Sequence, residues 1–137
     1  MGKKIIFLFG IVIFLTMTSN ASGESIRKKC KDEWGTDYRM VEYCIKKQSA
    51  AKGAVDRNRN NVPKEIMNFC EGEWKDDHRM LKYCIEKEVD ALVFLNKNKS
   101  NFDREIFSTC LNEWHPDYKM VKYCAEKQQA AKDRLSR

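Results

Sequence analysis

Hydrophobic positions recur at helical spacing along most of the chain, in short segments that come in pairs. Ile26, Cys30 and Trp34 follow one another at intervals of four residues, which places them on one face of a helix. The following segment has a largely apolar stripe made of Val41, Cys44, Ile45, Gln48, Ala51 and Val55. Gly35 lies between the two segments, where a tight turn is expected. The pattern predicts two antiparallel helices joined by a short turn.

This pair of segments occurs three times. The cysteines form two series with a period of 40 residues, which are Cys30, Cys70, Cys110 and Cys44, Cys84, Cys124. The three segments align without gaps on the pattern I-x3-C-x2-E-W-x2-D-[YH]-[RK]-M-[VL]-x-Y-C-x2-K. Self-similarity at one period indicates a fold built from one repeated unit. We therefore predict an all-α fold with helical-hairpin repeats over 24–57, 62–96 and 101–137.

An aspartate lies midway between the two cysteines of each unit, and aspartate is a favourable N-cap for the second helix. These residues are Asp37, Asp77 and Asp117. Cysteines placed symmetrically about the turn lie level on antiparallel helices, where their Cα atoms can reach the separation of about 4.4–6.8 Å that a disulfide needs. Among the fifteen pairings that six cysteines allow, the spacing selects Cys30–Cys44, Cys70–Cys84 and Cys110–Cys124. One continuous helix per unit would instead hold the two cysteines about 21 Å apart.

A tryptophan and a methionine flank each turn at equal distances from the aspartate. They are Trp34, Trp74, Trp114 and Met40, Met80, Met120. We predict that these residues close the hairpin tip and that the indole packs in the core on the disulfide and the methionine, because such rings dominate core burial. The alternative role for the tryptophans is an aromatic platform for a glycan or a peptide.

The middle unit is the most apolar of the three. Its second segment ends in the apolar run 89–95, and Met67 and Phe69 stand where the first unit has Arg27 and Lys29. A middle repeat that is covered on both sides should be more apolar than the capping repeats. This favours three hairpins stacked as a short solenoid over three hairpins that are loosely tethered.

The segments between units, 56–61 and 96–101, are polar and break the helical pattern. Asn61, and Ser100 or Asn101, mark the expected starts of the following helices. These linkers concentrate positive charge, in a set of candidate binding residues for an anionic envelope surface. The set is Arg57, Arg59, Lys97 and Lys99.

The first 21 residues have the layout of a secretory signal peptide. Lys3 and Lys4 precede an apolar run over 5–17, and small residues lead up to Ala21. The run is shorter than the about 20 residues that span a bilayer, so we expect cleavage after Ala21 rather than an uncleaved anchor, and no transmembrane segment afterwards. Cleavage would lower the net charge from +6 to +4. Export to the periplasm or the extracellular space agrees with reading six cysteines as a disulfide framework.

The core of the unit, C-x3-W-x3-[YH]-x-M-x2-Y-C, resembles a short motif in exported and membrane-anchored bacterial proteins that are uncharacterised. The resemblance implies a bacterial exported protein and no particular reaction. The architecture is also similar in kind to the disulfide-braced helical repeats of the Sel1-like class. The motif of that class differs, so this second similarity concerns the fold alone.

The composition and the motifs of the chain are compatible with few biochemical functions. Charged residues make up 34% and hydrophobic residues 42% of the chain, which excludes disorder along its whole length. Lysines alternate with acids, which is typical of a solvated face rather than the basic stripe of a nucleic-acid binder. The histidines, His78 and His115, occupy non-equivalent positions, and no zinc, haem, phosphate-loop or hydrolase motif occurs. We expect no catalytic residue, no metal site and no cofactor.

These patterns predict an exported, non-enzymatic helical-repeat protein that binds a protein or a cell-envelope component. The alternative is an envelope hydrolase, or a cationic inhibitor of one, that uses the basic linkers or the repeated carboxylates. Glu33 and Asp37 form such a pair four residues apart, and it recurs in every unit. Its threefold repetition favours a structural role, because folding units are repeated in small chains and catalytic centres rarely are.

Overall fold

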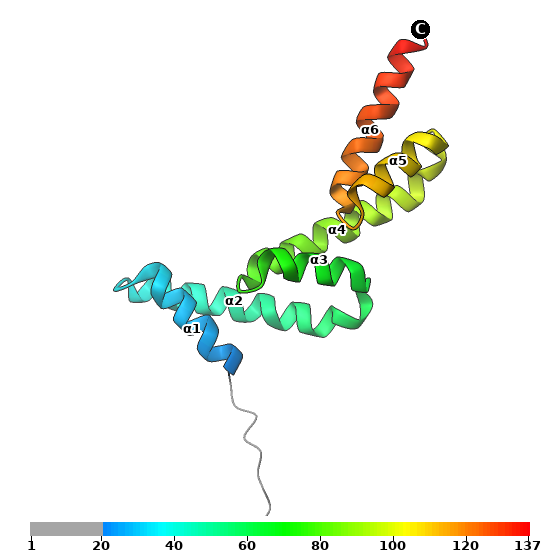
Figure 1. Cartoon of the computed structure of the whole chain (residues 1–137). Helices are drawn as coiled ribbons and strands as arrows, with labels where there is room; N and C mark the ends of the chain where they lie inside the picture. The colour runs from blue at the N-terminus through cyan, green and yellow to red at the C-terminus, as the bar shows by residue number, and fades with distance from the viewer. Residues whose placement is uncertain (1–20) are drawn as a thin grey trace, which may run out of the picture.

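The computed structural model describes residues 21–137, and this part of the chain consists of helices joined by short turns (Figure 1). Three helix pairs follow one another, and the 3-10 helices η1 (Arg59–Asn61) and η2 (Lys99–Asn101) join them. The pairs are α1 (Ala21–Trp34) with α2 (Tyr38–Asn58), α3 (Lys64–Trp74) with α4 (His78–Asn98), and α5 (Arg104–Trp114) with α6 (Tyr118–Leu135). The prediction of an all-α fold built from three helical hairpins is confirmed.

The signal peptide expected over 1–21 lies outside the described residues, apart from Ala21, which is the first residue of α1. None of the helices described over 21–137 combines the length and the apolar character needed to cross a bilayer.

Each hairpin turn ends at the predicted aspartate cap. A carboxylate oxygen of Asp37, Asp77 and Asp117 accepts a hydrogen bond from the backbone N–H three residues further on, at 3.2, 3.1 and 2.9 Å. In the first turn Gly35 has a φ of +53°, a left-handed conformation that glycine adopts without the steric cost of a Cβ atom. In the third turn α5 ends at Trp114, as expected from Pro116.

The three predicted disulfides are confirmed. The bridges Cys30–Cys44, Cys70–Cys84 and Cys110–Cys124 each join Cα atoms that lie 5.7 Å apart. They lock the two helices of each pair together near the turn. Three bridges in one chain favour an oxidising environment over the reducing cytosol.

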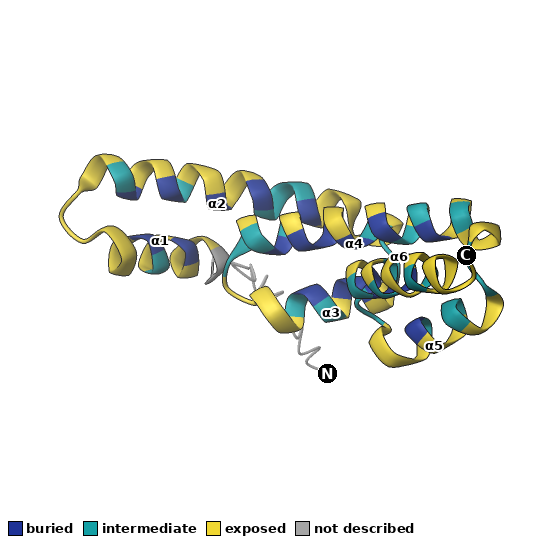
Figure 2. Ribbon diagram, turned by 90° about the horizontal axis from the view of Figure 1, so that it is seen from above, coloured by how far each residue is buried: buried dark blue, intermediate teal, exposed yellow. Residues whose placement is uncertain are grey.

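The second helices form the spine of the molecule. α2 packs against α4 and α4 packs against α6, while each first helix packs on the second helix of its own hairpin (Figure 1). Buried positions gather along the facing sides of these helices, and the outer sides are exposed (Figure 2). The helical pairs therefore stack stepwise, as predicted for a short solenoid.

The core is divided unequally between the units. A large cluster joins the second and third hairpins and includes Val55 of the first, together with Ile66, Leu81, Leu95 and Val121. A separate small cluster holds the first hairpin and consists of Ile26, Cys30, Val41 and Cys44, with Ile45 packed against it. The apolar middle unit supplies most of the large cluster, because α4 is covered by α2 on one side and by α6 on the other.

The linkers are more helical than the sequence pattern predicts. α2 continues to Asn58 and α4 to Asn98, so each polar segment begins inside a helix. The Asn58 amide donates to the Ala54 carbonyl at 3.0 Å, and the Asn98 amide donates to the Phe94 carbonyl at 2.8 Å. Each bond joins a side-chain amide to the carbonyl four residues earlier and so adds to the hydrogen bonding at the end of the helix.

The helix starts expected at Asn61, and at Ser100 or Asn101, are wrong because these residues belong to the 3-10 turns. α3 begins at Lys64 and α5 at Arg104. The cap of α5 is Asp103, whose carboxylate accepts from the N–H groups of Glu105 and Ile106, at 2.9 and 3.3 Å. The pattern missed this cap because a serine and two asparagines just upstream are equally good cap residues.

Candidate functional site

Successive hairpins are joined at one repeated position in the middle of the second helix. In the first hairpin this position is Gln48, which is buried in the apolar stripe of α2. Its amide donates to the Asp77 carboxylate at 3.0 Å, and its oxygen accepts from the Arg79 N–H at 3.2 Å. Gln48 therefore holds the first turn of α4 against the middle of α2.

This contact sets the ionisation of Asp77. Burial opposes the charged form of the carboxylate, but the bonds from Gln48 and from two backbone N–H groups outweigh it, and Lys29 adds an ion pair at 3.8 Å. The pKa of Asp77 is therefore lowered below its ordinary value. Beside it, burial lowers the pKa of the His78 imidazole.

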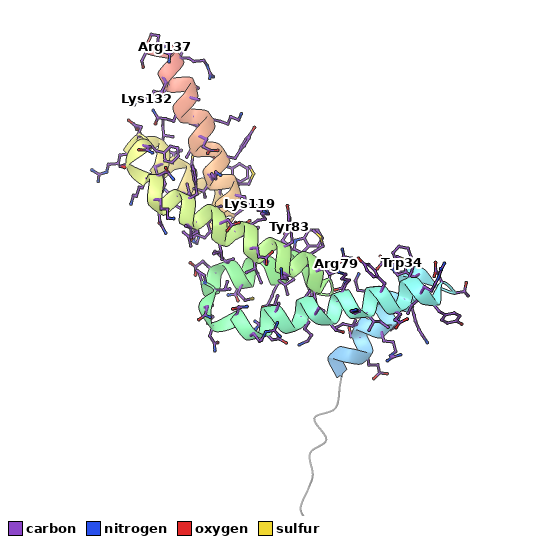
Figure 3. The ribbon with its side chains drawn as sticks, turned by 180° about the vertical axis from the view of Figure 1, so that it is seen from behind. Trp34, Arg79, Tyr83, Lys119, Lys132 and Arg137 are labelled. Carbon is purple, nitrogen blue, oxygen red and sulfur yellow. A yellow bond between two sulfur atoms is a disulfide. The ribbon has the colours of Figure 1, made fainter. Side chains whose placement is uncertain are left out.

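The second hairpin uses Glu88 at the same position. Glu88 is fully buried, and its carboxylate accepts from the Lys119 N–H at the start of α6, at 3.2 Å. The other carboxylate oxygen lies 3.1 Å from Lys119 Nζ and forms an ion pair with it. The angles of this contact do not meet those of a hydrogen bond. In Figure 3, Arg79 lies where α4 begins beside α2, and Lys119 lies where α6 begins beside α4.

Glu88→Ala is expected to lower the free energy of unfolding by about 2–3 kcal/mol, because it removes a charged acceptor and leaves a cavity. The matched variant Glu88→Gln places in α4 the residue that α2 already uses. It keeps an acceptor for the Lys119 N–H and loses only an ion pair with a half-exposed lysine, so the expected cost is under about 1 kcal/mol. Urea unfolding followed by circular dichroism measures the free energy of unfolding of both variants. Equal losses of stability in the two variants would show that the charge of Glu88, rather than its capping hydrogen bond, holds the junction.

A different set of residues repeats on the outer side of the spine. Tyr43, Tyr83 and Tyr123 are 48%, 53% and 56% exposed, although each lies two residues after a buried position. A lysine one turn further along lies over each ring, with its Nζ atom 5.3–5.5 Å from the ring centroid. We call this set the tyrosine–lysine surface. Its members are Tyr43, Lys47, Tyr83, Lys87, Tyr123 and Lys127.

The tryptophans are partly exposed rather than buried in the core. Trp34, Trp74 and Trp114 are 38%, 37% and 37% exposed, so the expected burial of the indoles is wrong. Each tryptophan is the last residue of its first helix, directly before the hairpin turn. In the view of Figure 3, Trp34, Arg79, Tyr83 and Lys119 follow one another along one edge of the molecule.

The methionines that flank the turns, Met40, Met80 and Met120, are partly buried. They close the hairpin tips only in part, since the neighbouring indole is open to solvent on one side.

The basic linker residues are partly engaged within the chain. Arg59 pairs with Glu71 at 2.6 Å, and this hydrogen bond raises the pKa of its guanidinium. Lys99 lies over the Phe107 ring, with Nζ 5.4 Å from the centroid. The structure does not bring these two together with Arg57 and Lys97 into one pocket.

The repeated carboxylates are placed for structure. In all three units the aspartate of the Glu33/Asp37-type pair accepts the N-capping hydrogen bond of a second helix. Within residues 21–137, no group of three or more histidine, cysteine, aspartate or glutamate side chains is arranged to hold a metal ion.

Comparison with protein-family models, with curated proteins and with solved structures finds no match to this chain. The function is therefore inferred from the fold and the surfaces described above.

Sequence reasoning overlooked the junction residues, although a signal was present. Gln48 and Glu88 are polar residues at the same register of an otherwise apolar stripe. A buried polar side chain needs a partner, and the N-terminal N–H groups of the next helix are unsatisfied donors of the kind that such a residue can bind. The tyrosines also repeat without change, but a helical pattern does not reveal that they stay exposed in the stack.

Proposed function

We propose that this chain is an exported, non-enzymatic binding module, and that the tyrosine–lysine surface contacts a protein or a cell-envelope component. The observation that carries this proposal is that three tyrosine–lysine pairs are identical although their rings are about half exposed. Packing explains identical residues at buried positions, but it does not explain identical rings that are about half exposed.

The chemistry of the surface indicates the kind of partner. Tyrosine offers a flat apolar ring with a hydroxyl group, and such residues are frequent among those that dominate binding energies. The lysine above each ring adds a cation that remains accessible to an anionic group. A partner that presents apolar or sugar faces beside carboxylates would match this repeated pair.

Export is supported by the disulfides, since these bridges persist in oxidising compartments. A non-enzymatic role is supported by the capping function of the repeated aspartates. These carboxylates hold helices in all three hairpins, which accounts for their repetition without any reaction.

Site-specific photo-crosslinking tests the surface. Benzoylphenylalanine in place of Tyr83 is expected to give a discrete adduct in the source cells, and adding Lys87→Glu should reduce its yield about tenfold, the effect of about 1.4 kcal/mol. The matched control carries the same probe at Asn68, an exposed position on α3 of the same hairpin. The proposal fails if positions 43, 83 and 123 all give no adduct, or if position 68 gives the same one.

A further inference from the structure

The third hairpin leaves exposed the positions that receive the next hairpin elsewhere in the stack. Leu135 is 89% exposed, whereas Val55 and Leu95, which precede it by two repeats and by one repeat, are 6% and 2% exposed. Gln128 is likewise exposed, whereas Gln48 and Glu88 are buried in contact with the following unit. Within residues 21–137, α6 is the last helix, so no described hairpin covers these positions.

A hollow lies at the same place on the third hairpin. It has a volume of about 350 Å³, and its lining includes Glu105 and Gln128, from α5 and α6 respectively. In the second hairpin the residue equivalent to Glu105 is Glu65, which accepts from the Tyr118 hydroxyl at 3.5 Å. The hollow is therefore the open counterpart of the site that the start of α6 occupies between the second and third units.

The first hairpin exposes the complementary edge. Tyr38, the first residue of α2, is 73% exposed, whereas its counterpart Tyr118 is 7% exposed. Ile45 is only partly buried, whereas Ile85 and Ala125 at the same position are 7% and 0% exposed. These are the positions that the second and third units bury when they dock on the preceding unit.

We infer that a second copy of this chain docks head to tail, with the start of α2 in one copy entering the hollow between α5 and α6 of the other. Tyr38 then meets Glu105 as Tyr118 meets Glu65. Gln128 binds the first turn of α2 as Gln48 binds the first turn of α4. The contact continues the step from α2 to α4 to α6 that already builds the stack (Figure 1).

The two surfaces of this contact are different, so the association is heterologous and extends into a ring or an open chain. A contact built from one hairpin step is small, and we expect weak association that depends on concentration. The tyrosine–lysine surface takes no part in it, so the inference does not rest on the proposed function.

Sedimentation of the oxidised full chain with blocked faces tests the inference. Leu135→Asp blocks the side of the third hairpin that carries the hollow, and Tyr38→Asp blocks the complementary edge of the first hairpin. Both residues are exposed, so each variant should keep the wild-type melting temperature. Each variant alone should be monomeric, with association weakened at least about tenfold. A mixture of the two in equal amounts should form a dimer that does not extend, because it contains one intact hollow and one intact edge.

The matched control is Tyr83→Ala, which should associate like the wild type. The inference is overturned if the wild type stays monomeric up to about 1 mM, which would leave the exposed end as a plain cap or as a site for another protein. It is also overturned if the blocked variants associate like the wild type. Failure of the mixture to form a dimer would overturn it too, because that result is expected of an isologous contact and not of a head-to-tail one.

Discussion

Removal of the central disulfide by Cys70→Ser together with Cys84→Ser is expected to lower the free energy of unfolding by about 3 kcal/mol. In the chain-entropy model this is the effect of opening a loop of about 15 residues. Both cysteines are buried inside the large core cluster, at 0% and 3% exposure. Serine at these positions also places hydroxyl groups among apolar side chains, which adds to the loss. Urea unfolding under non-reducing conditions, followed by circular dichroism, measures it.

The matched control removes the bridge of the first hairpin with Cys30→Ser and Cys44→Ser. This bridge lies in the small separate cluster, so its loss should unfold α1 and the start of α2 while the rest of the stack remains folded. Hydrogen exchange should then show lost protection over α1 and the start of α2 alone. Equal, global unfolding in the two double variants would contradict the division of the core that the structure shows.

The disulfides and caps could be predicted because they depend on local spacing. Two cysteines at equal distances from a capping aspartate define a hairpin whatever surrounds it, and the three turns obey this rule with a Cα separation of 5.7 Å. A unit of about 40 residues is also close to the size at which a core alone barely sustains folding. A repeat of this length therefore gains stability from a covalent brace.

Positions that depend on the neighbouring unit could not be predicted in this way. Tyr38 and Tyr118 occupy the same position of the repeat and carry the same side chain, yet Tyr38 is 73% exposed and Tyr118, which starts a helix docked on the preceding hairpin, is 7% exposed. Leu95 and Leu135 occupy the same position of the repeat and carry the same side chain, yet only Leu95 has a following hairpin to cover it. Burial in a stack is decided by which units are adjacent, and helical periodicity within one unit does not contain this information.

Leu95→Ala is expected to lower the free energy of unfolding by about 3 kcal/mol, through lost apolar burial and the cavity that remains. Leu95 lies near the end of α4 in the large cluster, together with Val121 of α6, so the cavity would open between the second and third hairpins. Chemical unfolding at low protein concentration measures this loss for the isolated chain.

Leu135→Ala is the same substitution one repeat later, and at low concentration it should change the free energy of unfolding by less than about 0.5 kcal/mol. The two positions are equivalent in the repeat, and only Leu95 is covered by a following hairpin among the described residues, so the difference between the variants measures what one docked unit contributes at this position. If two copies dock as we infer, the effect of Leu135→Ala should grow as the concentration rises, because docking would then bury Leu135 as the third hairpin buries Leu95. Equal losses at positions 95 and 135 in dilute solution would contradict the exposure of the last helix.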